Sequence, residues 1–239
     1  MKTVIPFQFI AYHLQTVPPG LRELMFFSEP QDTDAESAVN WYEQELLGWL
    51  FDNDRVRRLI LRSLELREDA TARLSVTDPF IEKRGTEAGD IDLLLFDDRA
   101  PDRAVAIECK RVKVKVESFE PETVTKLNGL EKGVREANKL FKLGFSKTYL
   151  AVLIVVDGRY RKEFGMLSRG ATGQQFKSVY QFSNLTELHH SAGLTFIEVV
   201  QPSTLSIDEM GYVGVAGEKR AIPVDQREQI TNKIMSLQR

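Results

Sequence analysis

Four charged side chains stand on two neighbouring apolar stretches in the middle of the chain. Asp90 and Asp92 alternate with apolar residues in the first stretch, and Glu108 and Lys110 do so in the second. Successive side chains of a strand point to opposite faces, so each pair shares one face. The Asp- and Pro-containing segment 97–102 between the stretches is typical of a turn. The sequence therefore predicts a hairpin that brings Asp90 or Asp92 beside Glu108 and Lys110.

The chemistry of such a group follows from its charges. Two carboxylates about 4 Å apart repel by about 4 kcal/mol at an effective dielectric constant of about 20, or roughly three pKa units. Either one acid holds a proton at neutral pH or a cation lies between them. Hard oxygen ligands suit Mg²⁺ or Mn²⁺, which bind through one or two carboxylates together with water and substrate phosphate. Such a metal activates water, while Lys110 orients it or stabilises charge on the phosphate.

These residues carry a resemblance to a known family. G-D-I-D-L-L-L followed by A-V-A-I-E-C-K resembles the PD-(D/E)xK nuclease superfamily, in the form of its archaeal resolvase and restriction-like branches. The resemblance implies that Asp92 and Glu108 are catalytic and hold the metal, with the backbone carbonyl of Cys109 as a third ligand. It also implies that Lys110 positions the attacking water. The family's proline is absent here, and Asp90 stays open as the alternative to Asp92.

A surface hairpin with an ordinary Glu–Lys ion pair is the competing interpretation. Such an exposed pair contributes at most about 1 kcal/mol. Glu108-Cys109-Lys110 is the chain's only acid-any-Lys triplet, and it follows Ala-Val-Ala-Ile on one strand and Leu-Leu-Leu on the preceding one. Surface strands rarely carry such apolar runs, which favours a buried site.

Composition sets broad limits on the class of protein. The chain has 239 residues, of which 42% are hydrophobic and 28% charged, as in an ordinary globular protein. Cys109 is the only cysteine, so an internal disulfide is excluded, and no apolar run is long enough to span a membrane. We therefore expect a cytoplasmic protein. The net charge of −3 counts against a protein that coats DNA, but less against a nuclease, because metal ions supply positive charge at the scissile phosphate.

The elements that must position the hairpin follow from hydrophobic periodicity. The pattern predicts a helical region over 35–67 broken at 52–54, strands at 71–84, 89–96 and 104–116, a helix over 122–143 ended by Gly144, a strand at 149–156, a helical segment around 183–191, and a strand at 194–200. This order matches the αβββαβ core that the resemblance implies. We expect an α/β, restriction-endonuclease-like fold with a mixed central sheet flanked by helices, in which a right-handed crossover makes the strand at 149–156 parallel to its neighbour.

The domain organisation follows from the same order. We expect an N-terminal extension at 1–34, the nuclease-like core at 35–200 and a C-terminal addition at 201–239 that packs on the core. The addition contains a glycine-rich piece, 211–217, and a final charged helix from Asp225.

Further acids are candidates for the site. The family places an extra Glu on the helix before the sheet, which implies Glu43 or Glu45, although an exposed helix Glu is usually only a solvated charge. Glu82 lies just upstream of Asp92 and is a further candidate, with a loop or edge charge as the alternative.

Basic residues predict where a nucleic acid would lie. Arg111, Lys113 and Lys115 alternate with valines, so one face of that strand is basic, as suits a phosphodiester backbone. The alternative is a Lys-decorated edge that blocks aggregation. Lys126 and Arg135 on the 122–143 helix are further nucleic-acid-binding candidates, with a solvated helix face as their alternative.

The residues and the resemblance together predict a Mg²⁺- or Mn²⁺-dependent deoxyribonuclease that hydrolyses phosphodiester bonds in restriction, defence or repair. The alternative is a non-catalytic nucleic-acid-binding or adaptor member of the same fold; a third interpretation is an α/β protein with an unrelated carboxylate hairpin. Nucleic acid is the expected partner, a membrane is not, and a homodimer is allowed. The sequence leaves open DNA or RNA, strandedness, specificity, endo- or exonuclease action, and oligomeric state.

Overall fold

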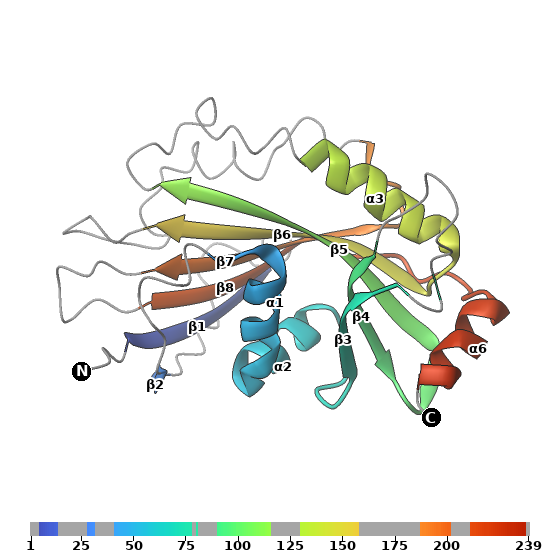
Figure 1. Ribbon diagram of the computed structural model, residues 1–239, viewed down its shortest axis with the longest axis horizontal. Helices are drawn as coiled ribbons and strands as arrows, with labels where there is room; N and C mark the ends of the chain where they lie inside the picture. The colour runs from blue at the N-terminus through green and yellow to red at the C-terminus, as the bar shows by residue number, and fades with distance from the viewer. Residues whose placement is uncertain are drawn as a thin grey trace.

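A single mixed sheet organises the chain. The computed structural model describes residues 5–13, 28–31, 41–77, 80, 90–115, 130–157, 187–201 and 211–237. Within this part, eight strands form one sheet in the order β2-β1-β8-β7-β6-β5-β4-β3 (Figure 1). The strands are β1 (Ile5–His13), β2 (Ser28–Gln31), β3 (Thr71–Val76), β4 (Ile91–Asp97), β5 (Ala100–Lys115), β6 (Lys147–Asp157), β7 (Gly193–Gln201) and β8 (Gly211–Lys219).

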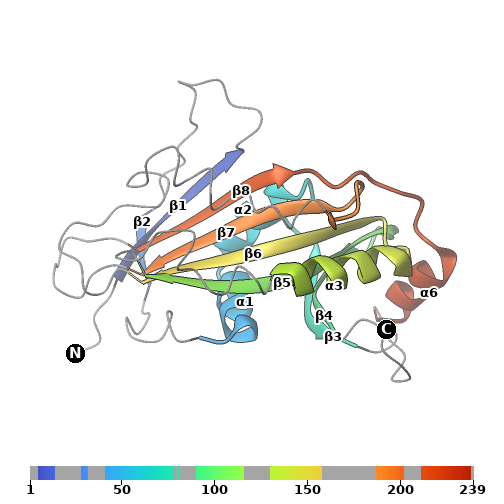
Figure 2. The ribbon, with the colours of Figure 1, turned by 90° about the horizontal axis from the view of Figure 1, so that it is seen from above.

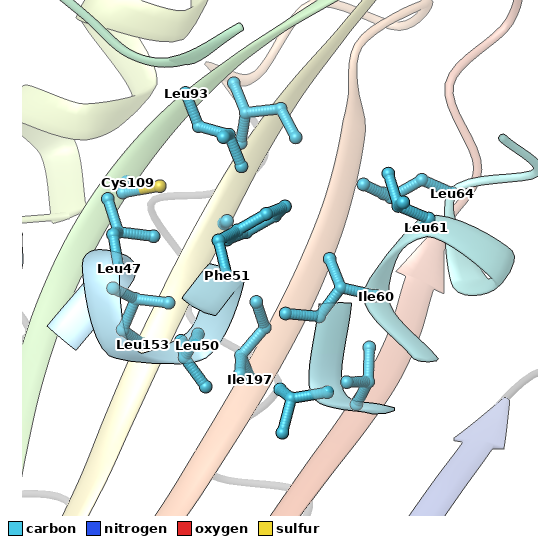
Figure 3. Packing of buried hydrophobic residues seen from close by; sticks show 14 of the residues in the cluster. Leu47, Leu50, Phe51, Ile60, Leu61, Leu64, Leu93, Cys109, Leu153 and Ile197 are labelled. Carbon is cyan, nitrogen blue, oxygen red and sulfur yellow. The ribbon is translucent and has the colours of Figure 1, made fainter. Parts of the chain in front are cut away.

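Helices cover both faces of this sheet, which confirms the predicted α/β class. They are α1 (Glu43–Asp52), α2 (Asp54–Ser63), α3 (Leu130–Leu143) and α6 (Glu228–Leu237). The first two pack on one face, where α1 and α2 residues such as Leu47 and Ile60 meet Leu153 and Ile197 of the sheet (Figure 3). On the other face, α3 and α6 pack against β4 and β5. None of the described helices combines the length and apolarity needed to cross a bilayer.

The break between α1 and α2 falls where the sequence predicts it. Asn53 lies between the two helices, and its side-chain oxygen accepts hydrogen bonds from the backbone N–H groups of Arg55 and Val56, both at 3.1 Å. This is an N-cap, which satisfies donors that the first turn of a helix leaves without partners. The cap therefore marks the start of α2 directly after the end of α1.

The hairpin of β4 and β5 is tighter than predicted. The expected turn at 97–102 and strand start at Ala104 are wrong, because Asp97 pairs with Ala100 and only two residues separate the strands. The Asp97 side chain accepts a hydrogen bond from Arg99 N–H at 2.9 Å, which closes the turn locally. Pro101 is tolerated in β5 because β6 pairs only from Val105 onward, so no ladder bond is lost on that side.

The predicted parallel pairing of the strand after α3 with its neighbour is confirmed. The helix α3 connects β5 to β6, which pair in parallel from Val105 opposite Lys147 to Lys115 opposite Asp157. Figure 2 shows α3 lying along these two strands. Gly144 ends the helix with a φ of 96°, a left-handed conformation that glycine adopts without steric cost. The strands predicted at 149–156 and 194–200 are confirmed as β6 and β7.

Two parts of the chain differ from expectation. Only 187–191 of the predicted helical segment around 183–191 lie in the described part of the chain, where Glu187 is in a 3₁₀ turn and Ala192 N–H donates to His189 O in a further turn. The glycine-rich piece in the C-terminal addition is part of β8, which pairs with both β7 and β1. Glycine-rich composition hides this strand, because the alternation that marks strands needs side chains. The predicted final helix is confirmed as α6.

Candidate active site

The site lies where β4 stops pairing with β5. The last pair between these strands is Leu93 with Ile107, whereas β5 continues beside β6 as far as Lys115 (Figure 1). In the described part of the chain, no strand pairs with this edge of β5 beyond Ile107. The backbone N–H and C=O groups of an unpaired edge are available to side chains and ligands.

Asp92 occupies this edge. Its Oδ2 accepts a hydrogen bond from the Cys109 N–H at 2.7 Å, so a side chain replaces the next rung of the ladder. Asp92 is 8% exposed and Glu108 is 4% exposed. The two acids that the sequence predicts to meet are therefore both buried at one place. The Cys109 thiol is buried in the apolar cluster beneath α1.

Lys110 lies on the same face of β5 as Glu108. Its Nζ contacts Glu108 Oε1 directly, donates to the Cys109 carbonyl at 2.9 Å and lies 3.0 Å from Glu136 Oε2. Glu108 and the Cys109 carbonyl accept hydrogen bonds from the ammonium, which has three N–H donors, and Glu136 pairs with it by charge. The charge of Lys110 is therefore held at one position among the acids.

The helix α1 supplies a third acid. Glu43 Oε2 accepts a hydrogen bond from the Arg111 N–H at 2.7 Å, one position beyond Lys110 on the same unpaired edge. Glu45, the other candidate on that helix, instead accepts from the N–H of Tyr42 at 2.6 Å and caps its own helix. The structure thus brings Glu43 to the edge of β5 and leaves Glu45 outside it.

Burial dominates the electrostatics of these acids. It raises the pKa of Asp92, although the Cys109 N–H and the charge of Lys110 oppose the shift. Burial, then the charge of Asp92, raise the pKa of Glu108 to about 9. Burial likewise raises the pKa of Glu43, with Lys110 opposing. At neutral pH we therefore assign a proton to the Glu108 carboxyl.

Lys110 and the fourth acid of the site, Glu136, shift each other's pKa. Burial acts to lower the pKa of Lys110, but the carboxylates of Glu108, Glu136 and Glu43 outweigh it, so the net shift is upward. Burial acts to raise the pKa of Glu136, and its bonds with Glu108 and Lys110 reverse that effect. Lys110 therefore stays charged.

The donor set suits a hard divalent cation. Asp92 and Glu108 offer carboxylate oxygens, and the Cys109 carbonyl shares their edge. Among the described residues, no three His, Cys, Asp or Glu side chains converge to hold a metal ion by themselves. Two carboxylates with a carbonyl and water are nevertheless the kind of ligand set that Mg²⁺ accepts. Burial, and then the charge of Asp92, raise the pKa of Glu108, and a cation bound between the two acids would favour its ionised form.

The remaining acidic candidates are placed as follows. Asp90 is half-buried just before β4, and its charge contributes to the raised pKa of Asp92. Glu82 lies outside the described residues.

The described basic candidates of β5 lie on the other face of the strand from Glu108, where the charge of Glu43 acts on Arg111. Arg111 and Lys113 are half-buried and alternate along β5 with Lys110, so they lie on the opposite face from Glu108. Arg135 is exposed on α3. The side chain of Lys115 and the whole of Lys126 lie outside the described part of the chain.

Sequence reasoning missed Glu136. No motif pointed to this residue of α3, and its side chain meets Lys110. A signal did exist, because Gly133 stands one turn earlier in the helix interior. Glycine there costs about 1 kcal/mol relative to alanine and usually has a packing reason.

In comparisons with known proteins, no protein-family model, curated protein or solved structure matches the chain.

Proposed function

We propose that the protein is a divalent-metal-dependent nuclease of the PD-(D/E)xK superfamily that hydrolyses phosphodiester bonds in DNA. The observation that carries the proposal is the position of Asp92, Glu108 and Lys110 together at the unpaired edge of β5. Burying ionised groups costs several kcal/mol each, even when they are paired. Binding of a cation and a phosphate would be a functional reason for burying these groups despite the cost.

The acids would hold the metal. Asp92, Glu108 and the Cys109 carbonyl are the groups that would bind Mg²⁺ or Mn²⁺. When bound, such an ion supplies a Lewis acid for the phosphate and lowers the pKa of a water molecule. The residues fit this role because Asp92 is already fixed by the Cys109 N–H, and because a bound cation would favour the ionised form of Glu108, which burial disfavours.

Lys110 would act on the phosphate. Its ammonium carries a positive charge at the same edge as the two acids, where negative charge would grow on the phosphate oxygens during cleavage. Preorganised donors at such a position stabilise the transition state, commonly by about 2.7–4 kcal/mol each. Two of its donors are bound to Glu108 and to the Cys109 carbonyl, and the ion pair with Glu136 keeps the ammonium beside them.

The order of elements supports the fold assignment. The helices α1 and α2 are followed by β3, β4, β5, α3 and β6, which is the αβββαβ order that the resemblance implies. Fold alone does not define activity, so the site carries the functional part of the proposal.

The test is a panel of labelled single- and double-stranded DNA and RNA, incubated with Mg²⁺, Mn²⁺ or EDTA. We expect metal-dependent cleavage of DNA that EDTA abolishes. Asp92→Asn is the matched variant, because an amide keeps an oxygen for the Cys109 N–H but loses the charge; it should be inactive. Binding of DNA without cleavage by the wild type would instead support a non-catalytic member of the fold. Neither binding nor cleavage would overturn the proposal.

A further inference from the structure

The Lys110 side chain takes a defined path across the sheet. A Cβ atom built on Gly133 of α3 would lie 2.6 Å from Lys110 Cγ and 3.1 Å from Leu150 Cδ1. Real Cβ atoms essentially never approach other atoms as closely as the first distance. The stem of Lys110 therefore runs directly beneath the backbone of α3, and only glycine at position 133 leaves the room.

The same helix holds the other end of the side chain. Glu136 lies three residues after Gly133, so both are on one face of α3. Glu136 Oε2 is 3.0 Å from Lys110 Nζ, and Glu136 Oε1 is 3.5 Å from Lys132 Nζ. Both members of the Lys110–Glu136 pair are largely buried, with side-chain exposures of 20% and 19%. The pair is thus better shielded from solvent than an ordinary surface ion pair.

A lysine needs such restraint if it is to act as a positioned donor. Its flexible four-carbon stem leaves many conformations open. Glu108 alone cannot fix the ammonium during the proposed reaction, because Glu108 is also a proposed metal ligand. Glu136 is on a different element and is not a proposed ligand, so it can keep Lys110 in place.

We propose that Gly133 and Glu136 are positioning residues: Gly133 opens the path for the Lys110 stem, and Glu136 fixes its ammonium beside Glu108. The catalytic consequence rests on the proposed nuclease function. The structural part, the coupling between α3 and Lys110, does not depend on it.

The first experiment separates positioning from metal binding. Glu136→Gln should lower the single-turnover cleavage rate about 10- to 100-fold, as loss of a supporting partner does, with Mn²⁺ affinity unchanged within about twofold. Glu136→Asp should recover part of the rate, because the charge returns on a shorter arm. Glu131→Gln, the same change at an exposed position of α3, should cleave as the wild type. A wild-type rate in Glu136→Gln would overturn the role of Glu136.

The second experiment concerns the path. Gly133→Ala should lower the cleavage rate and the stability, since the new methyl group displaces Lys110 or α3. Gly48→Ala in α1 is the matched control, because a Cβ there meets no atom within 4 Å. Helix propensity alone would make both changes stabilising. If Gly133→Ala is as stable as Gly48→Ala and cleaves at the wild-type rate, the Lys110 stem does not require glycine at position 133, and the proposed role of Gly133 is wrong.

The third experiment is independent of cleavage. A double-mutant cycle of Lys110→Met and Glu136→Gln, measured by urea unfolding in EDTA, should give a coupling of at least about tenfold in the folding equilibrium constant, about 1.4 kcal/mol. Strictly additive effects would overturn the inference even if the wild type is a nuclease. A wild type that cleaves nothing, together with strong coupling, would instead refute the proposed function and leave the positioning intact.

Discussion

The carboxylate of Asp92 accepts a hydrogen bond from the backbone N–H of Cys109 at 2.7 Å, one step beyond the last backbone pair of β4 with β5. A side chain thus completes the ladder where the two strands separate. The bond favours the ionised carboxylate and so opposes the effect of its burial. It also fixes Asp92 before any ligand arrives, which reduces the cost of binding a cation at this edge.

Metal binding should stabilise the folded protein. Asp92 and Glu108 gain a cation that the unfolded chain cannot hold between them, so linkage predicts about 2.7 kcal/mol when free Mn²⁺ is 100 times its dissociation constant. For a chain of this size the melting temperature should rise by roughly 5–10 °C. Calorimetry or thermal scans with Mn²⁺ and with EDTA measure the change. Asp92→Asn should respond far less, and an unchanged wild-type melting temperature would count against the site.

Glu108 should make the metal-free protein less stable as pH rises. Its ordinary pKa is 4.5 and its pKa in the folded protein is about 9, mainly because it is buried beside Asp92. Between these values the folded protein holds a proton that the unfolded chain has lost. The contribution of this bound proton to the free energy of unfolding is therefore fully present below pH 4.5, and it is lost as pH rises through about 9.

The matched variant is Glu108→Gln, which cannot ionise. One proton corresponds to about 1.4 kcal/mol per pH unit, so the variant should gain stability relative to the wild type between about pH 6 and about pH 8.5. Urea unfolding in EDTA at the two pH values tests this. Parallel pH dependence of the two proteins would show that Glu108 does not hold the proton.

The hairpin could be predicted from the sequence because its signals are local. Alternation of apolar and charged residues places Asp92 and Glu108 on one face, and strand pairing then brings them together. The break at Asn53 and the end of α3 at Gly144 could also be predicted locally, because single residues there have strong conformational preferences.

Other features depend on contacts between distant segments. Glu43 lies three, four and seven residues before the buried Leu46, Leu47 and Leu50, so it shares their side of α1, whereas Glu45 points away from it. The contact of Glu43 with β5 still depends on how α1 docks on the sheet. Likewise, the way in which α3 crosses Lys110 determines that Glu136 meets the lysine. Strand β8 could not be predicted from alternation, because its glycines have no side chains that would point to one face or the other. Its backbone nevertheless pairs with β7 on one edge and with β1 on the other.

The contrast between Glu43 and Glu45 can be tested directly. Glu43→Gln keeps an oxygen for the Arg111 N–H but removes a negative charge near Asp92 and Lys110, so Mn²⁺ affinity should fall about tenfold. Glu45→Gln should leave the affinity unchanged and cost at most about 1 kcal/mol of stability through its cap. Isothermal titration of both variants with Mn²⁺ distinguishes them. Equal affinities would place Glu43 outside the metal's environment.

Lys110 distinguishes a nuclease from a protein that only binds metal. Its Nζ meets Glu108, Glu136 and the Cys109 carbonyl, so its charge sits beside the proposed metal ligands without being one of them. The benefit of that charge should be greatest in the transition state, where the phosphate oxygens become more negative. Lys110→Ala should therefore slow cleavage much more than it weakens metal binding.

We expect Lys110→Ala to lower single-turnover cleavage by roughly two to three orders of magnitude, or about 2.7–4 kcal/mol, as for the loss of one such donor. Mn²⁺ affinity should be retained or rise slightly, because a nearby positive charge is gone. Asp92→Ala should lose both cleavage and Mn²⁺ binding, since it removes a ligand and leaves the Cys109 N–H without its acceptor. Cleavage rates and Mn²⁺ titrations are to be measured side by side for the two variants. Full activity in Lys110→Ala would refute the assigned role of the lysine even if the metal site proved correct.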